Sequence, residues 1–125
     1  MALSSESLEA IVVAVLAVNH YELEKAWGLL PSLRRAGLTD PAKVANEDLG
    51  TLTVRLAHAG YNRGILTEMM AARLLGLMMA VHEGTLDRFD GHVASGEQDS
   101  AAALLCKIHG IGPHVAATAW ALVKG

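Results

Sequence analysis

Apolar residues recur at the spacing of an α-helix along most of the chain. In the first such segment Leu8, Ile11 and Val15 share one face, and Ser4 or Ser5 stands where a helix cap is expected. Similar segments follow one another to the end of the sequence. The few β-forming residues are embedded in this helical pattern, so it predicts helix after helix and no strand.

Caps, prolines and glycines set the expected helix boundaries. The second predicted helix covers residues 23–30; Pro31 ends it or starts a new turn, and Gly37 ends the segment. Further helices are predicted over 41–45, from a cap at 46–48 to Gly60, and over 62–82, where Gly84 closes the helix. The last two are a helix capped by Asp99 or Ser100 and a helix over 113–123. Residues 84–98 contain three glycines among polar residues and are predicted to form a surface loop.

Composition agrees with this pattern. The 125 residues are 52% hydrophobic but only 4% aromatic, and a core of Leu, Ala, Val, Ile and Met favours helices over sheets. The length suits one core and is short for two domains. We therefore expect one all-α domain over residues 1–125, a bundle or barrel of six to seven helices, in which residues at about 100–123 form two helices joined by a short hairpin turn.

The last two predicted helices are joined by Gly110-Ile111-Gly112, followed at once by Pro113. Glycines permit positive φ and let a foreign backbone come close, and proline favours the first position of a helix. The free N–H groups at the start of that helix point outward and carry partial positive charge. The segment therefore predicts an anion-binding turn.

The same segment resembles the helix-hairpin-helix motif, which it matches at Leu105, Ile108, Gly110, Ile111, Gly112 and Ala116. The resemblance implies that the turn holds a DNA phosphate without reading bases. The residues implied for this role are Lys107, His109, Gly110, Gly112 and His114. It further implies a sodium or potassium ion held by three backbone carbonyls, those of Cys106, Ile108 and Ile111. The alternative is a turn that merely packs two helices together.

A wider resemblance connects three segments to the barrel of the helix-hairpin-helix DNA glycosylase superfamily, in particular its endonuclease III and adenine glycosylase branch. These segments are the opening helix over 8–16, the turn Ala59-Gly60-Tyr61-Asn62-Arg63, and residues 104–122. The resemblance implies that Asn19 enters the gap left by a flipped base. A helix-end cap is the alternative role for Asn19.

The departures from that superfamily concern its chemistry. His114 stands where bifunctional members have the lysine that attacks the sugar. The catalytic aspartate expected beyond the motif falls outside the 125 residues. Cys106 is the single cysteine, so no iron–sulfur cluster is expected. Asp90 lies before the turn, and we take its likeness to the family's Asp-x-His-Val as coincidence. The sequence thus predicts sequence-nonspecific DNA binding in a repair setting, without independent base excision and without a cofactor other than the alkali cation.

Two alternatives stay open. One is a divergent glycosylase that acts on damaged bases and takes its acid from Asp90, Asp87 or a second subunit. The other is a protein-interaction module. For the DNA-binding protein itself we expect a homo-oligomer or a protein partner, because one turn grips few phosphates.

The distribution of charge and the absence of a membrane-span pattern limit which partners and which compartment we expect. The net charge is −3, yet residues 104–125 hold Lys107 and Lys124 with no acid, so the expected DNA-binding end is mildly basic on an acidic body. The apolar run at 11–18 is too short for a membrane span and lacks a basic leader. We expect a cytoplasmic protein that does not bind membranes.

The remaining chemistry-bearing residues are assigned mainly to structure. The six histidines show no metal-ligand spacing. Trp27 is expected inside, on one face with Leu23 and Leu30, while Tyr61 is undecided between core and surface. We expect four methionines to lie in the core and not on a partner-binding surface: Met69, Met70, Met78 and Met79.

Overall fold

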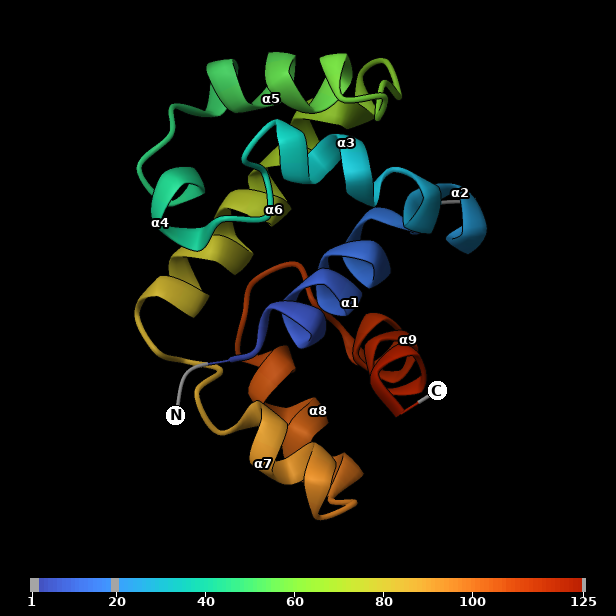
Figure 1. Ribbon diagram of the computed structural model, residues 1–125, viewed down its shortest axis with the longest axis vertical. Helices are drawn as coiled ribbons and strands as arrows, with labels where there is room; N and C mark the ends of the chain where they lie inside the picture. The colour runs from blue at the N-terminus through green and yellow to red at the C-terminus, as the bar shows by residue number, and fades with distance from the viewer. Residues whose placement is uncertain (1–2, 19–20, 125) are drawn as a thin grey trace.

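The computed structural model describes residues 3–18 and 21–124 (Figure 1). Nine helices lie in these two ranges: α1 (Ser5–Leu16), α2 (Leu23–Gly28), α3 (Leu30–Arg35), α4 (Pro41–Val44), α5 (Leu49–His58), α6 (Leu66–His82), α7 (Phe89–Ala94), α8 (Gln98–Cys106) and α9 (Pro113–Lys124). The same ranges contain no strand, which confirms the all-α prediction.

The centre of the molecule is α1. Every residue from Ile11 to Leu16 is at most 1% exposed, and a helix that is apolar all round is stable only when protein covers it on every side. Figure 1 shows α1 crossing the middle of the fold, with α9 packed along one side and α6 along the other. The helices that carry the turn after residue 106 are therefore fixed against the core.

Polar side chains secure the helix starts that the sequence predicted. Ser4 caps α1 through the N–H of Ser7, and Asp40 and Asp48 cap α4 and α5. Asp90, on α7, accepts hydrogen bonds from the Ser4 N–H (2.7 Å) and from the Ser7 hydroxyl. The first turn of α1 is thereby tied to a distant part of the chain by a carboxylate placed at a helix N-terminus.

Tyr61, which the sequence left undecided, belongs to the core. Its side chain is fully buried and its hydroxyl donates to the Leu16 carbonyl at 2.6 Å, at the end of α1. The Tyr21 ring lies 4.8 Å away, and the Arg63 guanidinium, which donates to the Val18 carbonyl, lies over that ring. Burial raises the pKa of Tyr61, so its phenol remains the protonated donor.

A charged pair joins α3 to the central helix. Arg34 donates two hydrogen bonds to the carboxylate of Glu9, at 2.6 and 2.7 Å. These bonds hold the pKa of Glu9 below its ordinary value. The pair fixes the position of α3 at the surface of α1.

Several sequence-based expectations about elements are wrong. The predicted count of six to seven helices becomes nine in the described ranges, because residues 23–35 form two helices that meet near Leu29 and because the expected loop at 84–98 contains α7. Phe89 explains the second difference, since its fully buried ring anchors α7 despite three nearby glycines. The long helix begins at Leu66, not Asn62, after a turn in which Asn62 accepts from the Gly64 N–H.

Side-chain burial also differs from expectation at three positions. Trp27 is 47% exposed, because α2 ends at Gly28 and Leu30 belongs to the next helix, so the apolar face assumed for Trp27 is not continuous. Met70 and Met78 are fully buried as expected. Met69 and Met79, however, are 37% and 44% exposed and lie on the outer side of α6.

Candidate functional site

The turn between α8 and α9 is built on two buried isoleucines. Ile108 and Ile111 are each 5% exposed, and the Ile111 N–H donates to the Ile108 carbonyl at 3.1 Å. The residues between and beside them are turned outward: Lys107, His109, Gly112 and His114 are exposed. The core therefore holds the turn by its apolar residues and leaves its polar groups facing solvent.

The two glycines of the turn have different roles. Gly110 has φ +94°, a conformation that L side chains rarely adopt, so glycine is required there. Gly112 does not have positive φ, and a Cβ at this position would meet nothing within 4 Å. The fold places no demand for glycine at residue 112, and a side chain there would extend into open space.

The backbone N–H groups at this turn are available to a ligand. Within residues 3–18 and 21–124, no protein group accepts a hydrogen bond from the N–H of Gly110, Gly112 or His114. The Gly112 carbonyl accepts from the Ala116 N–H at 3.0 Å, which makes Gly112 the N-cap residue immediately before α9. Unused donors at the start of a twelve-residue helix favour an anion.

The carbonyls expected to hold a cation lie along the same turn. The Ile108 carbonyl already accepts from the Ile111 N–H, whereas those of Cys106 and Ile111 receive no hydrogen bond within the part of the chain that the structure describes. A carbonyl oxygen has two lone pairs and can serve two partners. These three carbonyls fit the proposed alkali-ion site by chemistry.

Arg73 joins the turn from a different part of the chain. A methyl group placed on Gly110 would lie 2.9 Å from Cγ and 3.5 Å from Nε of Arg73, so the arginine side chain rests directly on this glycine. One helical turn further along α6, Gly76 faces the carbonyl of His109. The middle of α6 thus supports the turn and brings a cation to it.

No acidic side chain in the described part of the chain pairs with Arg73. Its side chain is half-buried, and among the described residues it forms no hydrogen bond and no ion pair. Lys107 and His114, on the turn itself, likewise have no acidic partner there. Sequence reasoning missed Arg73 because nothing local connects it to Gly110. The only hint was a glycine, Gly76, in the middle of a long helix, where glycine weakens the helix and often marks a close approach.

The sequence also named three residues outside the turn as candidates, one for DNA contact and two for a catalytic acid. Asn19 lies outside the described residues. Asp90, the alternative source of a catalytic acid, uses both carboxylate oxygens to bind Ser4 and Ser7 at the start of α1. Asp87 is exposed beside Gly84. Neither aspartate is brought to the turn by a contact within the described chain.

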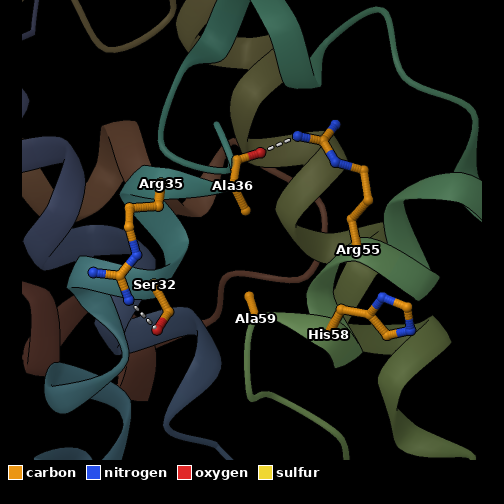
Figure 2. A pocket seen from close by; sticks show the side chains of 6 residues that line it. All are labelled: Ser32, Arg35, Ala36, Arg55, His58 and Ala59. Atoms are coloured by element: carbon orange, nitrogen blue, oxygen red, sulfur yellow. Dashed lines mark hydrogen bonds between the residues drawn. The ribbon is translucent and has the colours of Figure 1, made fainter.

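A basic concavity of about 390 Å³ lies between α3 and α5 (Figure 2). Its side chains do not converge: Figure 2 shows Arg35 folded back onto the Ser32 hydroxyl, Arg55 reaching the Ala36 carbonyl, and the His58 ring turned away from both. Arg35 and His58 are the last residues of their helices. Because a positive charge there offsets the partial negative charge of a helix C-terminus, we assign Arg35 to helix stabilisation.

Within residues 3–18 and 21–124, no group of three or more His, Cys, Asp or Glu side chains is arranged to hold a metal ion. None of the helices described has both the length and the apolar character needed to cross a membrane. In comparisons with known proteins, no family model, no curated protein and no solved structure matches the chain. The turn between α8 and α9, with Arg73 beside it, is the candidate site that geometry favours.

Proposed function

We propose that the protein binds the DNA backbone through the turn between α8 and α9, without reading base sequence and without excising bases itself. The observation that carries the proposal is that the N–H groups of Gly110, Gly112 and His114 have no acceptor among the described residues and lie next to Arg73, which no acid in those residues pairs with. Backbone amides at a helix start suit a phosphate oxygen. Contacts to phosphate position a protein on DNA but carry no base information.

The arrangement supports a clamp with two sides. The amides of the turn form one side of the clamp. The two basic side chains form the other, Arg73 reaching the phosphate from α6 and Lys107 from the end of α8. Arginine suits this role because its planar guanidinium donates two parallel hydrogen bonds to phosphate. The bulk of the protein is acidic, with a net charge of −3, so we expect weak binding that depends steeply on salt.

The absence of excision is proposed on chemical grounds. His114 offers no primary amine for attack on the sugar, and Asp90 is engaged at the start of α1. We therefore also propose that the likeness to base-excision glycosylases concerns the DNA-binding turn and not the reaction. Incubation with duplexes carrying uracil, alkylated or oxidised bases tests this, and excision by excess protein would contradict it.

The direct test is a salt titration of binding to labelled duplex, single-stranded and abasic DNA by fluorescence anisotropy. We predict that Lys107→Ala lowers the magnitude of the slope of log affinity against log salt by about one, because one phosphate contact is lost. Lys25→Ala, on α2, is the matched control and leaves the slope unchanged. If the wild-type protein fails to bind duplex DNA even at low salt, the proposed function is wrong.

Arg73 provides a second, independent test. We predict that Arg73→Gln weakens duplex binding about tenfold or more, since a charge-assisted hydrogen bond contributes about 1.5–3 kcal/mol. Arg73→Lys should restore the salt slope but not the full affinity, because an ammonium group lacks the paired donors. Arg88→Gln controls for loss of one positive charge. Unchanged binding by a folded Arg73→Gln variant would remove α6 from the interface.

A further inference from the structure

A second surface, formed by α2 and α9, is apolar and open. A cavity of about 310 Å³ is lined by Leu23, Glu24, Trp27 and Leu122. A neighbouring cavity of about 210 Å³ shares Trp27 and Leu122 and reaches the first turn of α1 at Glu6. Figure 1 shows α2 and α9 on the same side of the molecule. We call these two cavities together the tryptophan groove.

The tryptophan groove leaves large apolar side chains exposed to water. Trp27 is 47% exposed and Leu23 is 39% exposed. Large aromatic groups that stand in a concave apolar surface are characteristic of protein interfaces, where tryptophan often contributes more to affinity than any other residue. The groove therefore has the composition of a docking surface for an apolar ridge.

Charge identifies the kind of partner. The carboxylates of Glu6 and Glu24 line the groove, and neither forms an ion pair within the described residues. The acids that do form such pairs, for example Glu9 with Arg34, lie elsewhere. The surface thus combines an apolar floor with an acidic rim.

A second copy of this chain is disfavoured by the same charges. Two identical grooves packed face to face around a two-fold axis would bring the acidic rims of both copies into one interface. Like charges brought together in a desolvated interface oppose association. An occupant with apolar residues along one face and basic residues beside them satisfies both the floor and the rim.

We propose that the tryptophan groove binds an amphipathic basic helix of another protein, with apolar side chains seated against Trp27 and Leu122 and flanking lysines or arginines facing Glu6 and Glu24. This mode of recognition lays the apolar face of a helix into a hydrophobic groove. Because the groove is built from α1, α2 and α9, it does not use the turn at Gly110 or Arg73. The proposal is independent of DNA binding.

The experiment uses two 18-residue helical peptides with the same leucine face, one with lysines and one with glutamates on the polar face. The sequence has two tryptophans, so Trp120→Phe leaves Trp27 as the single reporter. We expect the lysine peptide to shift Trp27 emission to shorter wavelength and to bind at least about tenfold more tightly than the glutamate peptide. Leu122→Ala should weaken binding about tenfold. The double variant Glu6→Gln, Glu24→Gln should remove most of the preference for lysine.

A separate apolar patch between α5 and α6 is the matched control. Ile65, Met69 and Glu68 line a separate cavity between α5 and α6, so Met69→Ala and Glu68→Gln should leave peptide binding unchanged. The proposal is overturned if both peptides bind equally tightly. It is also overturned if Met69→Ala and Glu68→Gln lower the affinity for the lysine peptide as much as the groove variants do. So does concentration-dependent dimerisation that Trp27→Ala abolishes, since the occupant would then be a second copy.

Discussion

Replacing Gly112 with aspartate is expected to weaken DNA binding at least about tenfold while leaving the fold intact or slightly more stable. Gly112 is the N-cap residue just before α9, lacks positive φ, and would place a Cβ in open space. Aspartate is a better residue than glycine at the start of a helix, and its charge suits the helix dipole. We therefore expect the free energy of unfolding to rise by about 0.3–1 kcal/mol.

The loss of affinity has the same physical origin as the gain in stability. The new carboxylate accepts hydrogen bonds from the first amides of α9, which are the donors that the proposed phosphate needs. It also repels that phosphate. Gly112→Ser provides a milder version, because a serine hydroxyl competes for the same amides without adding charge.

Chemical denaturation and anisotropy titrations measure the two effects on the same samples. Gly28→Asp is the control for added negative charge, since Gly28 also lacks positive φ and has open space around its Cβ. It should leave DNA affinity nearly unchanged. If Gly112→Asp is as stable as expected and binds DNA as tightly as the wild-type protein, phosphate does not bind at this turn.

Local chemistry made many helix boundaries predictable. Ser4, Asp40 and Asp48 cap helices because their side chains accept from backbone N–H groups two or three residues ahead, an interaction contained within a few residues of sequence. Gly60 and Gly84 follow their helices with positive φ for an equally local reason. The outward-facing polar groups around Gly110 also follow from a short stretch of chain.

What sequence reasoning missed depends on contacts between distant segments. Arg73 meets Gly110 only because α6 passes beneath the turn, and no periodicity links the two. The sequence predicts a buried Trp27 because Leu23, Trp27 and Leu30 would share one helical face, but α2 ends at Gly28 and Leu30 belongs to α3. The helix at 89–94 is hard to predict because it contains Gly91 and is flanked by Gly84 and Gly96, although Leu86, Phe89 and Val93 have helical spacing and the first two are fully buried.

We expect Gly110→Ala to lower the free energy of unfolding by about 3 kcal/mol. A side chain at φ +94° costs about 1–2 kcal/mol, and crowding in a packed site adds about 1–3 kcal/mol. The crowding comes from Arg73 Cγ, 2.9 Å from the position of the new Cβ. Gly76→Ala is the control: its Cβ would lie 4.0 Å from the nearest atom, the His109 carbonyl oxygen, so it should stabilise α6 by up to about 1 kcal/mol.

A double-mutant cycle separates the two contributions at Gly110. Arg73→Ala removes the side chain that a Cβ on Gly110 would meet, so only the backbone cost of about 1–2 kcal/mol should remain when Gly110→Ala is introduced in that background. The difference between the two costs, measured by urea denaturation, is the coupling between α6 and the turn. An identical cost in both backgrounds would mean that Arg73 does not rest on Gly110, and the guanidinium would then lose its place in the proposed phosphate clamp.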